Sequence, residues 1–386
     1  MMPRLFSFLV FFSIATGIVG GLHYFLWLRL VRDTGLHGTA RTAATAALVV
    51  LALSIPLSFV AMRTLPRALG KFLFWPMYLW MGFLLLGFFT LLAVYFVRTL
   101  SFWIGAAPDL ERRQFLIRWS SALGGAMAAL LGGYALVRGR SLPAVKKIEV
   151  ALKRLPRTLD GITIVQLTDV HIGPTLGREF VEALVERTNA LLPDVIAITG
   201  DLIDGSVAEL SDAVAPLGQL RARHGVFFVT GNHEYYSGVD GWIDELRRLG
   251  IRVLSNERVA IGNEAQFDLV GIDDLSAFGD GHRPDLPGAL AGRDATRELV
   301  LLAHQPRVMK QAVAHGVGLQ LSGHTHGGQI WPWNYFVYLQ QPFVVGLHAV
   351  GDTQIYVSPG TGYWGPPMRL GSRAEITQVV LRSAWG

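Results

Sequence analysis

The chain has 386 residues and a mass of 42.3 kDa, enough for a membrane region together with one soluble domain. Charged residues make up only 16% and the mean hydropathy is +0.38, which excludes a wholly soluble protein, because soluble domains average about 25% charged residues. Cysteine is absent, which excludes disulfides, cysteine-ligated zinc, iron–sulfur clusters and thiol nucleophiles. Many of the basic residues behind the net charge of +5 flank apolar segments, so we expect no nucleic-acid partner.

Four apolar segments fill the first third of the chain, each close to the roughly 17–25 residues that a membrane-spanning helix needs. Basic residues lie between them and tryptophans near their ends, as in membrane proteins. A buried soluble bundle would instead carry charged faces at helical spacing. We therefore predict a multi-pass transmembrane anchor of about four helices over residues 1–140. Its segments are Leu5–Leu28, Ala43–Met62, Phe72–Val97 and Trp119–Val137.

Two signals disagree about the side of the membrane on which the rest of the chain lies. Arg112 and Arg113, followed by Gln-Phe-Leu and a moderately apolar segment, look like a twin-arginine export signal. The alternative is an ordinary pair of juxtamembrane arginines. Basic residues after the fourth segment favour the cytoplasm under the positive-inside rule. We favour an extracytoplasmic position for the rest of the chain over a cytoplasmic one, on a bacterial inner membrane.

The pattern changes after Arg140. Residues 141–160 hold two prolines and a basic cluster, and are predicted to be a basic linker and first strand region. Residues 161–386 alternate short apolar runs with amphipathic stretches, which predicts an α/β domain with layered sheets. The expected strands are Ile162–Leu167, Val195–Thr199, Val226–Thr230, Phe267–Val270, Leu299–Ala303, Leu319–Leu321, Gln354–Val357 and Ile376–Leu381. The expected helices are Arg178–Leu192, Val207–Arg223 and Trp242–Leu249.

Five of the expected strands run directly into polar residues of the kinds that bind metals. In open α/β sheets, ligand sites form beyond the carboxyl ends of the strands. We therefore expect these side chains to meet at one edge. In chain order they are Asp169 and His171, Asp201 and Asp204, Asn232, His233 and Glu234, His304, and finally His324 and His326.

These blocks resemble the calcineurin-like metallophosphoesterase superfamily, in the family's order and with helix-length spacing, from roughly Lys146 onward. The runs around His304 and His324 look like the membrane-associated bacterial branch. The resemblance implies a layered α/β/β/α sandwich and metal-dependent hydrolysis of phosphoric esters. The matching motifs are Asp169-x-His171, Gly200-Asp201-x-x-Asp204-Gly205, Gly231-Asn232-His233-Glu234, His304, and Gly323-His324-x-His326.

The family's ligand sets transfer to this chain residue by residue. The resemblance implies one ion held by Asp169, His171, Asp201 and His326, and a second by Asp201, Asn232, His304 and His324, with Asp201 shared. Two divalent ions about 3.5–4 Å apart can activate water and stabilise the attacking and leaving oxygens, so no side-chain nucleophile is needed. Mixed nitrogen and oxygen ligands suit Mn, Fe or Zn.

His233 matches the family's histidine that binds no metal. It is the candidate for stabilising transition-state charge or protonating the leaving group. The resemblance implies that Asp204 orients His233, and Glu234 is a further candidate for support. Any single histidine of the set is more often structural, but the ordered motifs together favour a metal site. Asp273 and Asp274 are expected to be turn residues.

An aromatic stretch follows the last motif, with Trp331, Trp333, Tyr335, Phe336 and Tyr338 at its centre. One interpretation is that these residues pack over the sandwich. The other is a hydrophobic rim that meets the bilayer and admits an amphipathic, lipid-linked phosphoester. The sequence leaves both interpretations open.

The function predicted is two-metal hydrolysis of a phosphodiester or phosphomonoester from lipid or the cell envelope. The alternative is a membrane-anchored metal-binding interaction module or sensor built on the same fold. Interaction modules of that kind have lost metal ligands, whereas this chain keeps every one of the family's ligand positions. A transport role is disfavoured because the apolar segments carry no charged residue deep in their cores.

Overall fold

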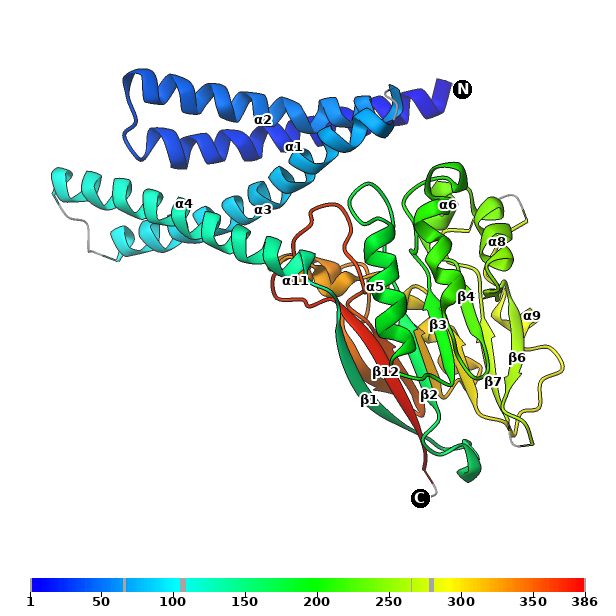
Figure 1. The fold of residues 1–386 in the computed structure, drawn as a ribbon. Coiled ribbons are helices and arrows are strands. Elements are labelled where there is room, and N and C mark those ends of the chain that lie inside the picture. The colour runs from blue at the N-terminus through cyan, green and yellow to red at the C-terminus, as the bar shows by residue number, and fades with distance from the viewer. Residues whose placement is uncertain (1, 65–66, 105–108, 265, 278–280, 385–386) are drawn as a thin grey trace. The chain divides into compact units, whose positions relative to one another are not determined.

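The computed structural model describes residues 2–64, 67–104, 109–264, 266–277 and 281–384. The chain divides into two compact units. The first comprises Met1–Arg138 with Gly365–Met368, and the second comprises Gly139–Trp364 with Arg369–Gly386. Figure 1 gives the element labels used below.

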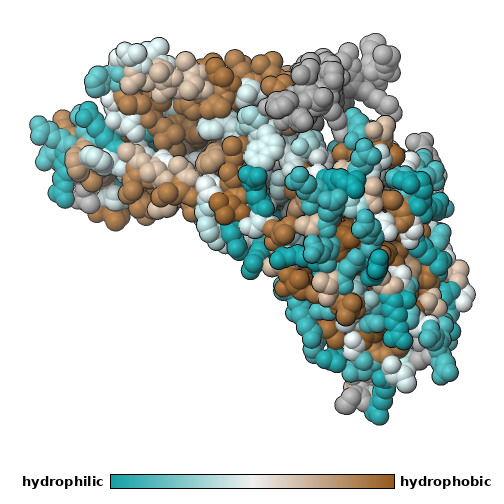
Figure 2. Space-filling view, viewed as in Figure 1, coloured by the Kyte–Doolittle hydropathy of each residue, from teal (hydrophilic) through white to brown (hydrophobic). Residues whose placement is uncertain are grey.

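The first unit consists of long apolar helices, and all four are long and apolar enough to cross a membrane. The first three pack through a small apolar core that includes Leu26, Phe74 and Leu84. Figure 2 shows many apolar side chains on the visible face of these helices, as lipid-facing helices require. The predicted four-helix region is confirmed. Its helices are α1 (Met2–Trp27), which continues into the π-helical turn η1 (Leu28–Arg32), α2 (Gly38–Thr64), α3 (Arg67–Trp103) and α4 (Leu110–Arg140).

The second unit contains two six-stranded sheets. In the first sheet β2 to β5 run parallel, while β12 is antiparallel to β2 and parallel to β1. Its spatial order is β1 (Ala144–Leu152), β12 (Glu375–Ser383), β2 (Thr163–Leu167), β3 (Val195–Thr199), β4 (Val226–Val229) and β5 (Arg252–Val253). Part of the segment expected to be the linker and first strand region is therefore an edge strand.

The second sheet has a parallel centre of β11, β9, β8 and β7, with an antiparallel strand at each edge. Its spatial order is β10 (Gly346–Val350), β11 (Thr353–Val357), β9 (Leu319–Ser322), β8 (Leu299–Leu302), β7 (Phe267–Gly271) and β6 (Glu257–Ile261).

Successive side chains along each strand point to opposite faces of its sheet, and so belong to different layers of the core. In β3, Val195 and Ala197 belong to the apolar core shared by the two sheets, whereas Ile196 and Ile198 belong to the core beneath the helices on the other face. Buried apolar side chains on both faces explain why these strands read as continuous hydrophobic runs. Helices α5 (Arg178–Asn189), α6 (Val207–Val214) and α8 (Val239–Arg248) cover the first sheet (Figure 1), and α9 (Leu286–Ala289) and α10 (Met309–Ala314) contribute to the core of the second. The predicted layered α/β/β/α architecture is confirmed.

All eight expected strands are present, and they are the eight interior strands of the two sheets. The other four strands, β1, β5, β6 and β10, are the four sheet edges. β1 lies in the segment expected to be a basic linker and first strand region, and β5, β6 and β10 were not expected. One expected helix was too long. Val207–Arg223 is α-helical only to Val214 and continues as the 3-10 helix η3 (Ala215–Gln219), because Pro216 has no backbone N–H to donate and its ring clashes with the preceding turn.

Trp242 provides a test of the packing beneath α8. Its side chain is fully buried and its indole Nε1 donates to the carbonyl oxygen of Gly205 at 2.8 Å. Trp242→Ala should lower the free energy of unfolding of this unit by about 3–5 kcal/mol, because it leaves a cavity and an unpaired carbonyl. Pulse proteolysis of the full-length chain across a urea series measures this change. The control Trp333→Ala, at a side chain that is 49% exposed, should change it by less than about 1 kcal/mol, and equal losses would contradict the packing described.

Candidate metal centre

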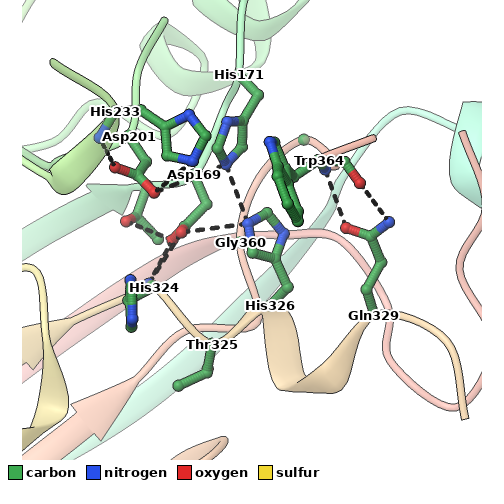
Figure 3. A network of polar contacts seen from close by, with 12 residues as sticks. Asp169, His171, Asp201, His233, His324, Thr325, His326, Gln329, Gly360 and Trp364 are labelled. Carbon is green, nitrogen blue, oxygen red and sulfur yellow. Dashed lines mark hydrogen bonds and ion pairs between the residues drawn. The ribbon is translucent and has the colours of Figure 1, made fainter. Parts of the chain in front are cut away.

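Ends of strands from both sheets bring the expected ligands together. Asp169 and His171 follow β2, Asp201 follows β3, and Asn232 begins the short helix α7 (Asn232–Ser237) after β4. From the second sheet, His304 follows β8, and His324 and His326 follow β9. All of these residues are buried except His324, which is half-buried. Figure 3 shows Asp169, His171, Asp201, His324 and His326, whose side chains lie close together beyond the strand ends.

Asp169, His171 and His326 form a first group whose donor atoms all lie within 4.8 Å of one another. The Nε2 atoms of His171 and His326 are 3.0 Å apart, and Asp169 Oδ1 lies 3.4 Å from His326 Nε2. Thr168 Oγ1 donates to Asp169 Oδ2 at 2.7 Å and orients this carboxylate.

Asp201, His304 and His324 form a second group of the same kind. His304 Nε2 lies 3.2 Å from both His324 Nδ1 and Asp201 Oδ2. The same Asp201 oxygen is 3.9 Å from His171 Nε2 in the first group. Asp201 therefore lies between the two groups, where one carboxylate could serve two ions.

The donor atoms present fit two divalent cations. In each group, nitrogen atoms of two imidazole rings face each other beside a carboxylate. Two nitrogen lone pairs this close repel each other unless a cation binds both or a proton lies between the rings. Asn232 Oδ1 is buried and has no hydrogen-bond partner among the described residues, which suits a ligand oxygen. Carboxylate, amide and imidazole ligands are compatible with manganese and zinc.

Asp204 links the first group to His233. Its Oδ1 accepts from His233 Nδ1 at 2.6 Å and from His171 Nδ1 at 3.1 Å, so one carboxylate orients both rings. Burial alone would lower the pKa of His233, but the hydrogen bond to Asp204 and the charges of Asp201 and Asp204 outweigh burial and raise it to about 9. For Asp204 the two histidines outweigh burial and hold the carboxyl pKa well below its usual range. The hydrogen bond to Asp204 holds the His233 ring with its Nε2 3.9 Å from Asp201 Oδ2.

Glu234 and Asp274 form hydrogen bonds with groups next to the candidate ligands. The buried Glu234 carboxylate accepts from the backbone N–H groups of Gly231, Asp201 and Leu202 at 2.6–3.0 Å, which ties the turns after β3 and β4 together. Asp274 was expected to be a turn residue. It does begin a turn, because its Oδ1 accepts from the Ser276 N–H at 2.8 Å. It is also buried and accepts from the side chain of Gln305, the residue after His304, at 2.9 Å.

The turns that carry the ligands depend on unusual backbone. Asp169, His171, Asp201, His324 and His326 all have φ between 50° and 70°, the left-handed region that side chains other than glycine rarely adopt. Such conformations concentrate at functional sites, where the surrounding structure holds them. Glycine is needed opposite two of these residues, since a Cβ at Gly323 would overlap the Asp169 carboxylate and one at Gly231 would overlap that of Asp201.

Arg369 is a component that motif reasoning missed. Its guanidinium is buried and donates to the carbonyl oxygens of Pro359 at 2.8 Å, Gly362 at 3.0 Å and His326 at 3.4 Å. Burial lowers its pKa to about 10, so it stays charged. This side chain fastens the backbone behind His326. Most of its partners are carbonyl oxygens, which every residue carries, so no sequence signal reveals these contacts.

Arg369→Leu should lower the free energy of unfolding by at least about 2 kcal/mol, because buried carbonyls lose their donor. It should also weaken Mn²⁺ binding roughly 10–100-fold, as the loss of outer supports of metal ligands usually does. Pulse proteolysis and isothermal titration with Mn²⁺ measure the two effects. Arg382→Leu is the control, because that arginine makes surface ion pairs with Glu149 and Asp160. Similar effects from both variants would show that the contacts behind His326 are unimportant.

Comparison with known proteins places this geometry in a family. Residues 162–328 match the model of the calcineurin-like phosphoesterases. A "transmembrane protein with metallophosphoesterase domain" from Danio rerio is 42% identical over 269 residues, covering 67% of this chain and 62% of its own length. The chain likewise spans 62% of a protein of the same description from Bos taurus.

A bacterial relative covers the chain more fully. An uncharacterized metallophosphoesterase of Helicobacter pylori strain J99 is 37% identical over 296 residues, which cover 74% of this chain and 78% of the relative. Relatives therefore occur in animals as well as in bacteria, so the resemblance is not restricted to a bacterial branch. Residues 162–328, which match the family model, contain every one of the candidate ligands described above, from Asp169 to His326. By this similarity the chain belongs to the calcineurin-like phosphoesterases.

Proposed function

We propose that this protein is a membrane-anchored hydrolase that uses two divalent metal ions to cleave a phosphodiester or a phosphomonoester. The observation that carries the proposal is the position of Asp201, whose Oδ2 lies within 4 Å of histidine nitrogens in both donor groups. His304, His324 and Asn232 would hold one ion with Asp201, and Asp169, His171 and His326 would hold the other.

When bound, the two ions would supply an activated water and neutralise charge on the phosphate oxygens. The remaining chemistry falls to the protein's own groups. His233 carries a proton on Nε2 and is held through Nδ1 by Asp204, so it is placed to donate that proton to the departing oxygen. Its side chain remains 16% exposed, which leaves it accessible to substrate.

We further infer a substrate from membrane lipid or the cell envelope. Two features support this: the four membrane-spanning helices, and the exposed aromatic side chains that follow the last ligand motif.

We place the protein in a bacterial inner membrane with the catalytic domain outside the cytoplasm, on the basis of the Arg112-Arg113 pair at the start of α4. Alkaline phosphatase fused to the C terminus should be active if this orientation is correct, and cytoplasmic fluorescence of a fused reporter would contradict it.

Metal dependence is tested first on the full-length chain in detergent. After removal of metals with a chelator, Mn²⁺ should restore hydrolysis of aryl phosphodiesters or monoesters. Asp201→Asn should reduce turnover by more than about 100-fold, because a shared ligand is a larger loss than an outer support. Absence of turnover with Mn²⁺, Fe²⁺ and Zn²⁺ in a folded protein would reject the hydrolase and favour the interaction module.

The role of His233 is tested with two leaving groups. His233→Asn should lower kcat for an alkyl ester by roughly 10²–10⁴-fold, because the alkoxide must be protonated as it leaves. The loss should be much smaller for a nitrophenyl ester, since nitrophenolate leaves without a proton. Metal content, measured by elemental analysis, should match the unmodified chain. Equal losses for both esters would indicate a role in charge stabilisation instead.

A further inference from the structure

An exposed aromatic surface surrounds the short helix α11 (Trp333–Val337). Exposed fractions run from 43% at Phe336 to 82% at Leu339. None of the five residues of α11 is buried. These side chains therefore do not form the packed insertion that was one of the two interpretations of the sequence. We call this set the α11 surface: Trp331, Trp333, Tyr335, Phe336, Tyr338 and Leu339.

The chemistry of this segment differs from that of an ordinary soluble surface. No Asp, Glu, Lys or Arg occurs between Gly327 and Gly351. Large exposed apolar patches mark places where a protein meets another surface. Tryptophan and tyrosine in particular are enriched where membranes meet water, because their rings are apolar and their N–H and O–H groups remain hydrated.

The chain itself indicates a bilayer as the occupant. Helix α4, a candidate membrane span, ends at Arg140, and β1 of the second unit begins at Ala144. Such a short connection keeps the unit at the membrane surface on whichever side it lies. Two exposed cations, Arg307 and Lys310, line a groove together with Phe343 and supply positive charge for anionic headgroups.

The α11 surface is built on the same segment as the metal centre. Gln329 lies between His326 and Trp331, and its side chain exchanges two hydrogen bonds with the backbone of Trp364, at 2.9 and 3.0 Å. The Trp364 ring is 55% exposed and lies 5.7 Å from the His233 ring. Figure 3 shows Trp364 and Gln329 beside the ligand side chains. Gln329 thus ties Trp364, which lies beside the candidate proton donor, to the segment that carries the α11 surface.

We propose that the α11 surface inserts into the interfacial layer of the membrane, and that this contact presents the phosphate of a bilayer lipid to the metal centre. The second half of the proposal rests on the proposed hydrolase function, whereas the membrane contact does not.

The absence of cysteine makes a direct test available. Leu339→Cys, on the α11 surface, and Leu192→Cys, between α5 and β3, replace leucines that are 82% and 86% exposed. Leu192 precedes β3 and so lies at the edge opposite the ligand-bearing strand ends. Each full-length variant is labelled with a nitroxide and reconstituted in phosphatidylcholine vesicles with and without phosphatidylglycerol. Power saturation then compares collisions with oxygen, which concentrates in lipid, against those with a water-soluble nickel chelate.

The label at 339 should collide more with oxygen than with nickel, and more strongly so when phosphatidylglycerol is present, while the label at 192 should show the reverse. Equal aqueous accessibility of both labels would overturn the proposal. Shielding of 339 from both reagents that develops only as the protein concentration is raised would assign the surface to a second copy, and would also overturn it. Because the measurement needs no turnover, an inactive protein with an inserted label would reject the hydrolase alone.

Discussion

The face-to-face packing of the two sheets is the constraint on which the candidate metal centre depends. Each donor group draws from both sheets, with Asp169, His171 and Asp201 from the first and His304, His324 and His326 from the second. Hydrogen bonds join the two edges, including His304 Nδ1 to the Thr199 carbonyl oxygen at 2.8 Å and the His324 N–H to Asp169 Oδ1 at 2.9 Å. In both groups at once, a shift of one sheet against the other would separate the ligands of the first sheet from those of the second.

This apposition gathers buried carboxylates and imidazoles that would destabilise the domain if they were unsatisfied. The turns meet that demand with backbone groups, as when the His233 N–H donates to Asp201 Oδ1 at 2.9 Å. Left-handed backbone at five of the ligand candidates lets short turns aim both side chains and N–H groups inward. The strain is held by supporting contacts, of which those of Glu234, within a motif, and Arg369, outside the motifs, are the clearest. Rigidity of this kind keeps ligands at fixed positions before a metal arrives.

The sequence predicted the strands that are buried on both faces, but it did not clearly predict the strands at the sheet edges. The interior strands carry apolar residues on both faces, so they stand out as hydrophobic runs. Edge strands face solvent and carry charge, as Lys146, Lys147 and Glu149 do in β1, so their pattern is weak. The candidate ligands were found because they directly follow interior strands and because their motifs resemble those of the calcineurin-like phosphoesterases. The support from Arg369 was missed because it acts on backbone atoms, and the α11 stretch was ambiguous because composition alone does not distinguish packed from exposed aromatic side chains.

The position of β12 has a consequence for biosynthesis. This strand follows every other strand in the chain, yet it lies between β1 and β2 within the first sheet. The sheet therefore has a gap until β12 has left the ribosome, long after the membrane helices have been made. Domains generally fold as units, so this one must wait as an incomplete sheet with unpaired strand edges. During that interval a growing chain tethered at the membrane would depend on chaperones or the insertion machinery to keep those edges from aggregating.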